Sequence, residues 1–251
     1  MKKLIDITYN SYDQKLDLIL PDSDKFDAVF IYFHGGGLVK GKKNPNARYA
    51  EYLASHNVAV ATANYRMYPD AKFPEFIEDA ADCVAGVKAH IAEYGACDKI
   101  FVGGSSAGGY LSMMLCFDEK YLSKHNIKPT DLAGFYHDAG QPTSHFNVLK
   151  FSGLDSRRVI IDETAPLYFI GHNGNDCPPM HILVSDQDME NRYEQTMLVL
   201  STLKHFGYDM SKISHDVLHG THCHQVGLVD ENGESVFGKM ILSFIHKTLH
   251  I

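Results

Sequence analysis

A glycine-rich stretch in the middle of the chain restricts the fold more than any other feature. It reads KIFVGGSSAGGYLSMMLCF, from Lys99 to Phe117, and joins a short apolar run to a helix-like run with almost no loop between them. Its centre, Gly104 to Gly108, spells G-x-S-x-G. A strand that turns directly into a helix strains the central residue and presses its neighbours against backbone, so glycine is needed on both sides. The pattern therefore predicts a strand, a tight turn and a helix, with Ser106 held out at the edge of a sheet.

The reactive serine of this pattern is predicted to be Ser106. The alternative, with Ser105 at the centre, requires glycine at positions 103 and 107, and residue 107 is Ala107. Backbone N–H groups at the start of the following helix would favour a developing negative charge. Phosphate-binding and dinucleotide-binding loops fit less well, because the lysine of G-x-x-x-x-G-K-[ST] and the spacing G-x-G-x-x-G are both absent. A plain tight turn is the purely structural alternative.

The rest of the chain alternates short apolar runs with longer amphipathic ones. Strands are expected at Leu4–Tyr9, Leu16–Leu20, Ala28–Phe33, Val58–Asn64, Ile100–Gly103, Leu132–Tyr136, His181–Ser185 and Ile213–Leu218. Helices are expected at Ala47–Ser55, Phe76–Tyr94, Ala107–Cys116, Arg192–Phe206 and Val236–Leu249. The first two strands read as a hairpin, and the later alternation predicts an α/β fold with a mostly parallel sheet and helices on both faces. Ligand sites in such sheets lie beyond the carboxyl ends of the strands.

A second glycine run follows the expected strand Ala28–Phe33. It reads HGGG, and it begins at His34. Three consecutive glycines lose much conformational entropy on ordering, which a loop with no further role rarely needs. They are needed where backbone N–H groups must reach a ligand, as in the oxyanion hole of acyl-transfer enzymes. We therefore expect the oxyanion donors to be the N–H groups of Gly36, Gly37 and Ala107, with His34 orienting the loop; a flexible loop at the sheet edge is the alternative.

A serine nucleophile also needs a base and a carboxylate that orients the base. The segment SDQDMEN, after the expected strand MHILV, offers Asp186, Asp188 and Glu190. The segment HGTHCH, after the last expected strand, offers His219, His222 and His224. Gly220 and Thr221 give His222 the freedom to fold back over the serine, whereas His219 would be fixed by its strand. Together with Cys223 these histidines are also candidate zinc ligands, but the hydrolase interpretation already uses one of them and is favoured.

The two glycine motifs together resemble those of the α/β-hydrolase fold, in the hormone-sensitive-lipase-like group of carboxylesterases. The segments NYRMYPDAKFPEFIED and APLYFIGHNGNDCPPMHILVSDQD are similar to that group as well, so the resemblance extends from about Leu16 to the C-terminus. It implies the chain order serine, acid, histidine. On this basis Asp188 is the expected acid and Asp186 caps the turn. The group's glycine two residues before the histidine matches Gly220 and His222.

Two departures from the group's pattern affect specificity. The aromatic residue that usually follows the glycines is Leu38 here, and the chain has no tryptophan, which argues against a kynurenine-formamidase-like specificity. Strands are expected from Leu4 onward, which leaves no room for the large N-terminal cap of the bigger esterases. The segment Tyr121–Ile161 is a candidate for a small lid. We therefore expect an open site that takes small acyl groups such as acetyl.

Composition excludes several other classes. The formal net charge is −8, which does not suit a nucleic-acid partner. The five cysteines are odd in number and form no CxxC pair, which favours reduced thiols over a disulfide framework. Neither a signal peptide nor a membrane span of roughly 18 apolar residues is visible. We expect one domain over residues 1–251, in the cytoplasm, with no cofactor and no metal; a homo-oligomer is left open.

These observations predict a serine hydrolase that acts on small-molecule esters through Ser106, His222 and Asp188. An amidase or formamidase with the same three residues is the first alternative. A non-catalytic ligand-binding protein on a hydrolase fold is the second, although such proteins usually lose one of the three residues. The sequence leaves the acyl group, the alcohol and the choice between ester and amide open.

Overall fold

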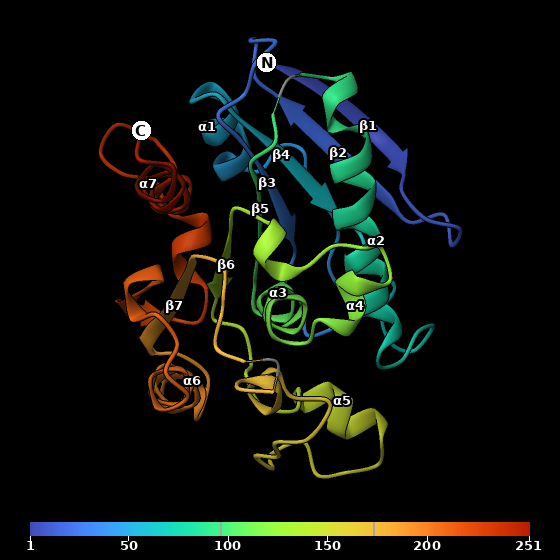
Figure 1. Ribbon diagram of the computed structural model, residues 1–251, viewed down its shortest axis with the longest axis vertical. Coiled ribbons are helices and arrows are strands. Elements are labelled where there is room, and N and C mark those ends of the chain that lie inside the picture. The colour runs from blue at the N-terminus through green and yellow to red at the C-terminus, as the bar shows by residue number, and fades with distance from the viewer. Residues whose placement is uncertain (96, 173) are drawn as a thin grey trace.

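The computed structural model, which describes residues 1–95, 97–172 and 174–251, contains one eight-stranded sheet with helices on both faces (Figure 1). The strand order is β1-β2-β4-β3-β5-β6-β7-β8. The strands are β1 Lys2–Thr8, β2 Lys15–Leu20, β3 Ala28–Phe33, β4 Val58–Ala63, β5 Ile100–Ser105, β6 Gly134–Asp138, β7 Met180–Gln187 and β8 Ile213–Thr221. The pairs β1/β2 and β2/β4 are antiparallel, and all other neighbouring strands are parallel. The predicted hairpin and mostly parallel sheet are confirmed.

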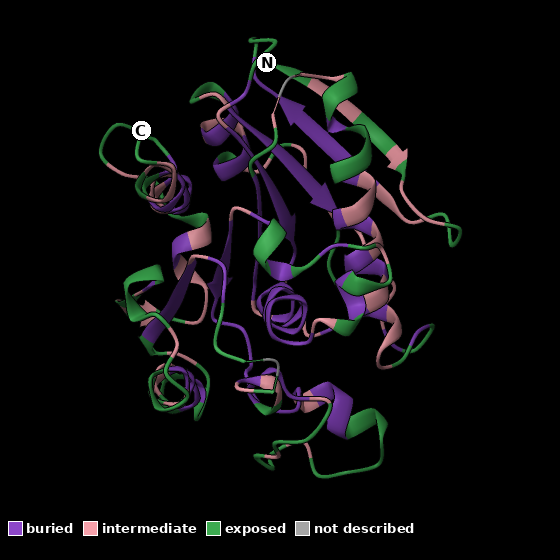
Figure 2. Ribbon diagram, in the orientation of Figure 1, coloured by how far each residue is buried: buried purple, intermediate pink, exposed green. Residues whose placement is uncertain are grey.

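The central strands are covered on both sides. β3 reads AVFIYF and β4 reads VAVATA, and every residue of both strands is buried. Such continuous apolar runs are typical of parallel strands that lie between two helical layers. Figure 2 shows the same pattern, with buried residues filling the middle strands and exposed ones gathered on the outer helices and loops.

Seven helices occur within the described residues: α1 Arg48–Ser55, α2 Glu75–His90, α3 Ala107–Phe117, α4 Lys120–Ser123, α5 Phe146–Phe151, α6 Arg192–His205 and α7 Val236–Leu249. Apolar side chains of α1 and α7 pack together on one face of the sheet, and those of α2, α3 and α6 pack on the other. All residues of α3 are buried. A helix that is apolar all round belongs in the interior, and α3 therefore fixes the turn that precedes it.

The differences from the predicted elements are local. The predicted helix over 76–94 ends at His90 and continues as a 3-10 turn over Ile91–Glu93, a common ending for a helix. Helices α4 and α5 were missed, because a helix of one or two turns shows no periodicity. β6 starts two residues later than expected, and it ends at Asp138, on a polar residue.

Candidate active site

The turn between β5 and α3 has the strained geometry that its glycines predict. Ser106 has a φ of 56° and a ψ of −114°, a backbone conformation that residues other than glycine rarely adopt. A Cβ atom on Gly104 would lie 2.6 Å from the carbonyl oxygen of Phe33, and one on Gly108 would lie 1.9 Å from the same oxygen. Only glycine fits at these two positions, and the serine side chain is held out at the sheet edge.

Three polar side chains meet at this edge. His222 Nε2 lies 2.8 Å from Ser106 Oγ, and His222 Nδ1 lies 2.6 Å from Asp188 Oδ1. Ser106 follows β5, Asp188 follows β7, and His222 follows β8, so three strand ends supply one group each. The order of contacts is that of a nucleophile, a base and the acid that orients the base.

The protonation of this chain of groups follows from the surroundings of Asp188. Its side chain is fully buried, which by itself raises the pKa. The hydrogen bond and charge of His222, with the N–H of Met189 at 2.7 Å, outweigh burial and leave the pKa of Asp188 below its ordinary value. The carboxylate is therefore ionised at neutral pH and accepts Nδ1–H. The lone pair on Nε2 then faces the hydroxyl of Ser106.

The other acids and histidines lie elsewhere. Asp186 and His219 form a separate pair, with 2.8 Å between Oδ2 and Nδ1 and side chains 42% and 82% exposed. Asp186, which was expected to cap a turn, lies within β7 and accepts the N–H of Gly220 in the neighbouring strand β8 at 2.9 Å. His224 Nδ1 lies 2.9 Å from the carbonyl oxygen of Thr221. Among these candidates, the structure thus brings Asp188 and His222 to Ser106.

In the described part of the chain, no group of three or more His, Cys, Asp or Glu side chains is placed to hold a metal ion. Within residues 219–224, His219 contacts Asp186 and His222 contacts Ser106, while Cys223 Sγ lies 3.6 Å from His222 Nε2. Nor does any helix among the described residues reach the length and apolar character needed to cross a membrane.

The expected oxyanion donors lie beside the serine. Among the residues that the structure describes, no hydrogen-bond acceptor faces the N–H groups of Gly36, Gly37 or Ala107. A Cβ atom on Gly35 would lie 3.2 Å from Ser106 Cβ, which shows how closely the glycine loop packs against the turn that holds Ser106. Gly36 and Gly37 have φ values of 123° and 67°, in the region that favours glycine. Gly36, Gly37 and Ser106 line the same cavity, and Ala107 follows Ser106 directly in the chain.

Side chains from three parts of the chain hold the glycine loop in place. The hydroxyl of Tyr65 donates to the carbonyl oxygen of His34 at 2.8 Å. His34 Nδ1–H donates to the carbonyl oxygen of Gly35 at 2.7 Å, which agrees with an orienting role for this histidine. Asn147 of α5 donates from Nδ2 to the carbonyl oxygen of Gly37 at 2.5 Å. Sequence reasoning missed Asn147, because nothing local in the sequence links α5 to a loop 110 residues away.

Sequence reasoning also missed a buried acid beneath the turn between β5 and α3. Asp138 ends β6 with a side chain that accepts hydrogen bonds from Ser105 Oγ and, at 2.6 Å, from Gln225 Nε2. Its carbonyl oxygen accepts the N–H of Ser106 at 2.8 Å. The hydroxyl of Tyr32 completes the chain by donating to Ser105 Oγ at 2.9 Å. Asp138 therefore ties the turn around Ser106 to the segment that follows His222. Its position as a polar residue at the end of a strand is the one feature of the sequence that could have identified it.

A cavity of about 650 Å³ opens over Ser106, His222 and the glycine loop. Besides the serine, the histidine and the glycine loop, it is lined by Val39, Phe146, Asn147 and Met189. The candidate lid over Tyr121–Ile161 is not one unit, because that segment contains the buried strand β6. Only its later part, through α5, contributes to the cavity wall. Met189 and Val39 are exposed, so the mouth of the cavity is open to solvent.

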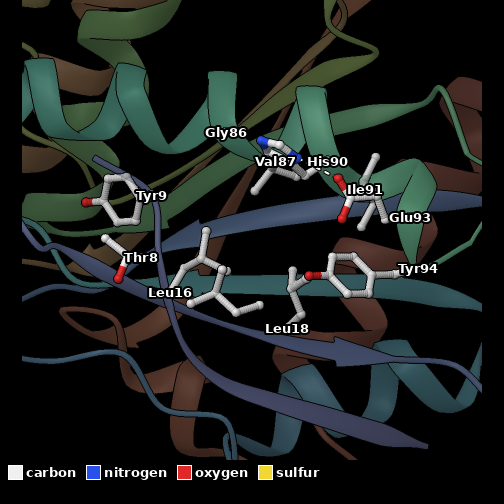
Figure 3. A pocket seen from close by; sticks show the side chains of 11 residues that line it. Thr8, Tyr9, Leu16, Leu18, Gly86, Val87, His90, Ile91, Glu93 and Tyr94 are labelled. Atoms are coloured by element: carbon white, nitrogen blue, oxygen red, sulfur yellow. Dashed lines mark hydrogen bonds and ion pairs between the residues drawn. The ribbon is translucent and has the colours of Figure 1, made fainter. Parts of the chain in front are cut away.

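A hollow of about 280 Å³ lies elsewhere, between the β1–β2 hairpin and α2 (Figure 3). Its walls are mainly apolar, with Leu16 and Leu18 from β2 and Val87 from α2. His90 and Glu93 contact each other at 2.7 Å beside it. None of the residues brought together at the carboxyl ends of the strands lines this hollow.

Comparison with known proteins agrees with this fold. Residues 16–203 match the BD-FAE family model. Esterase B from Lactobacillus rhamnosis has a similar structure, with a TM-score of 0.79 and 18% identity over 99% of this chain and 86% of that chain. At this identity the likeness concerns the fold alone, and it confirms the predicted α/β-hydrolase fold.

Two curated relatives match shorter segments. A probable isoprenylcysteine alpha-carbonyl methylesterase of Arabidopsis thaliana is 32% identical over 100 residues, which are 39% of this chain and 21% of that protein. The 3-O-acetylpapaveroxine carboxylesterase of Papaver somniferum is 31% identical over 104 residues, 36% of this chain and 33% of that protein. The matched segments thus span a third or less of the length of these relatives.

Proposed function

The chain belongs to the BD-FAE family and has the α/β-hydrolase fold, and we propose that it is a serine carboxylic-ester hydrolase. The observation that carries the proposal is the contact series from Ser106 Oγ through His222 to the buried carboxylate of Asp188. The names of both curated relatives describe ester hydrolysis, which supports the same reaction class.

In the proposed reaction Ser106 Oγ attacks the ester carbonyl while His222 Nε2 takes its proton. The negative charge on the former carbonyl oxygen is stabilised by the free N–H groups of Gly36, Gly37 and Ala107. In related chemistry one such donor contributes roughly 10²–10³-fold in rate. Protonated His222 then gives its proton to the leaving alcohol, and the acyl group stays on the serine.

Water completes the cycle. His222, neutral again, takes a proton from a water molecule that attacks the acyl-enzyme, and the serine leaves with the proton returned to it. Asp188 stays ionised throughout and stabilises the imidazolium that forms twice per turnover. Apart from the ester and the water molecule, these steps use groups of the chain itself.

We propose small acyl groups such as acetyl as the preferred substrates. The cavity over the serine is open, and its apolar wall is limited to a few side chains, among them Phe146 and Met189. A long acyl chain would leave much of its surface in water and gain little from the protein. Hydrolysis rates should therefore be highest for acetate or propionate and fall as the chain lengthens.

The test is a series of p-nitrophenyl esters, from acetate to decanoate, run beside acetanilide and formanilide. Turnover of the short esters, with slower turnover of long esters and of both anilides, is the expected result. Preference for an anilide would assign the chain to the amidases. Faster turnover of decanoate would contradict the proposed small acyl group while leaving ester hydrolysis intact.

A further inference from the structure

The segment after β6 supports the turn of the proposed nucleophile. The carbonyl oxygen of Asp138 accepts the N–H of Ser106 at 2.8 Å. A Cβ atom on Gly140 would lie 2.5 Å from the backbone carbonyl carbon of Gly109 in α3, so the chain after β6 packs directly against the helix that begins at the turn. Between these two contacts Ala139 has a φ of 49°, a conformation that residues other than glycine rarely adopt. Such a conformation persists only where neighbouring groups hold the backbone in place.

Arg192, the first residue of α6, contacts this segment through its guanidinium group. Its Nη1 donates to the carbonyl oxygen of Ala139, and its Nη2 lies 3.4 Å from Oε1 of Gln141. The backbone N–H of Arg192 donates to the carbonyl oxygen of Met189 at 2.9 Å, one residue beyond Asp188. One residue therefore joins the turn that carries the proposed catalytic acid to the segment after β6.

The charge of Arg192 is buried without an adjoining counter-ion. The residue is 4% exposed, it forms no salt bridge with any described residue, and the oxygens that it contacts on Ala139 and Gln141 are both neutral. The half-buried Arg66, by contrast, pairs with the carboxylate of Asp79 at 2.8 Å. Burying a cation away from a counter-ion costs much free energy. Hydrogen bonds to two neutral oxygens alone do not require a charged side chain, which points to a use for the charge itself.

The titratable groups around the guanidinium show where that charge acts. Burial lowers the pKa of Arg192, but the carboxylate of Asp188 opposes this shift, and Arg192 in turn helps to hold the pKa of Asp188 below its ordinary value. Cys223 and His145 also interact with the guanidinium; burial raises the pKa of Cys223 and lowers that of His145 to about 3, so both are uncharged at neutral pH. Asp138, whose pKa burial raises to about 7, also acts on Asp188. The positive charge therefore acts mainly on the proposed catalytic acid.

We propose that Arg192 is a positioning residue of the catalytic site, which clamps the turn that carries Asp188 to the segment after β6 and stabilises the buried carboxylate with its charge. The proposal rests on ester hydrolysis through Ser106, His222 and Asp188. Arg192 acts through Asp188, which orients the imidazole of His222, and its positive charge opposes protonation of that imidazole. Loss of Arg192 should therefore affect both the rate of catalysis and its dependence on pH.

Two substitutions separate the charge from the clamp. Arg192→Met removes both, whereas Arg192→Lys keeps the charge and loses the planar fork of donors. With p-nitrophenyl acetate, kcat should fall at least about tenfold in Arg192→Met and about threefold in Arg192→Lys, with KM within about twofold of the wild type. The midpoint of the acid limb of kcat/KM should move to higher pH by roughly half a unit in Arg192→Met, because losing a nearby positive charge favours the protonated imidazole. Arg192→Lys should keep the wild-type midpoint within about 0.2 pH unit.

Lys204→Met is the matched control, because Lys204 lies in the same helix with an exposed side chain. It should keep the wild-type kcat and midpoint. Asp138 is present in all four proteins, so its own titration cancels in the comparison. Unchanged kcat in Arg192→Met would overturn the clamp, and an unchanged midpoint would overturn the role of the charge. If urea unfolding shows that Arg192→Met does not fold, Arg192→Lys decides, and wild-type kcat in that variant would overturn the proposal.

A measurement without substrate separates this proposal from the proposed function. NMR spectra of protein labelled with ¹⁵N-histidine follow the titration of the His222 imidazole, and His222→Gln identifies its signals. The midpoint of this titration should also rise by roughly half a pH unit in Arg192→Met and stay unchanged in Lys204→Met. Should the wild type hydrolyse no ester while this midpoint still shifts, the proposed function fails and the effect of Arg192 on the site stands. Equal midpoints in the wild type and Arg192→Met would overturn the role of the charge whether or not the protein hydrolyses esters.

Discussion

Replacing Asp138 with asparagine should change how the stability of the protein depends on pH. The side chain is 1% exposed, and burial raises its pKa to about 7 although Ser105 and Gln225 donate hydrogen bonds to it. In the unfolded chain the same carboxyl group titrates near the ordinary aspartate pKa of 3.8. Folding therefore favours the protonated form of Asp138 between pH 3.8 and about pH 7. Asparagine has nearly the same shape as this protonated side chain but has no carboxyl proton to lose.

The magnitude follows from linkage between proton binding and folding. For an acid whose folded-state pKa is raised, the contribution to stability is fully present below the unfolded pKa and is lost as pH rises through the folded pKa. For Asp138 this window runs from about pH 4 to about pH 7. The slope approaches about 1.4 kcal/mol per pH unit and flattens near the upper end. Between about pH 5 and pH 7 the wild type should thus lose about 2 kcal/mol that Asp138→Asn keeps.

Urea unfolding of both proteins at several pH values measures this directly. The free energy of unfolding of the wild type minus that of the variant should fall by about 2 kcal/mol from about pH 5 to pH 7. Burial lowers the pKa of His137 and of His145 to about 3, which gives the opposite slope, but both proteins carry these histidines and the difference cancels them. Asp209→Asn is the control, because hydrogen bonds from Ser211 lower the pKa of Asp209 and confine its effect to acid pH. Parallel curves for wild type and Asp138→Asn would refute the reasoning.

Three further substitutions test the site and the turn. Asp188→Asn removes the charge that, in the proposed mechanism, orients the imidazole of His222. It should lower kcat roughly a thousandfold or more, with little change in KM, in steady-state kinetics on p-nitrophenyl acetate. A loss below about tenfold would contradict the proposed role of Asp188. Asn147→Ala removes the side chain that holds the carbonyl of Gly37, so kcat should fall by about tenfold and stability by about 1–2 kcal/mol; unchanged kcat would mean that α5 does not position the loop. Gly108→Ala places a Cβ atom 1.9 Å from a backbone oxygen and should cost more than about 3 kcal/mol in urea unfolding, whereas Gly227→Ala, with nothing within 4 Å, should cost less than about 1 kcal/mol. Equal costs for the two alanines would contradict the steric account.

The sequence was sufficient where function depends on local sterics. The turn around Ser106 and the glycine loop that begins at Gly35 are specified by close backbone approaches, and glycine at fixed spacing records such approaches directly. Continuous apolar runs likewise identified β3 and β4. These features require no knowledge of which distant segments come together.

The acid and the network behind it depend on tertiary structure. Strict alternation would place Asp186 and Asp188 on the same face, but β7 ends at Gln187 with a register shift after Ser185. Because of that irregularity, Asp186 contacts the solvent-exposed His219 whereas Asp188 points inward to His222. No pattern in the sequence indicates the register shift. Resemblance to a family, rather than alternation, gave the acid that the structure places at the histidine.

Residues such as Asp138 and Asn147 were missed for a related reason. Each acts through a partner far along the chain: Asp138 contacts Gln225, 87 positions away, and Asn147 contacts Gly37, 110 positions away. A side chain whose role is defined by a distant hydrogen bond has no local pattern. Polar residues at the carboxyl ends of predicted parallel strands are nevertheless candidates worth naming, and Asp138 is one of them.

The most direct test of the account is to find which atom reacts. A fluorophosphonate probe bonds covalently to an activated serine, and peptide mapping by mass spectrometry then locates the adduct. We expect the adduct on Ser106 in the wild type and none in Ser106→Ala, while Ser105→Ala, which alters only the buried neighbour, should still be labelled. An adduct on Ser105, or no adduct on a preparation that hydrolyses p-nitrophenyl acetate, would contradict the assignment of Ser106 as the nucleophile.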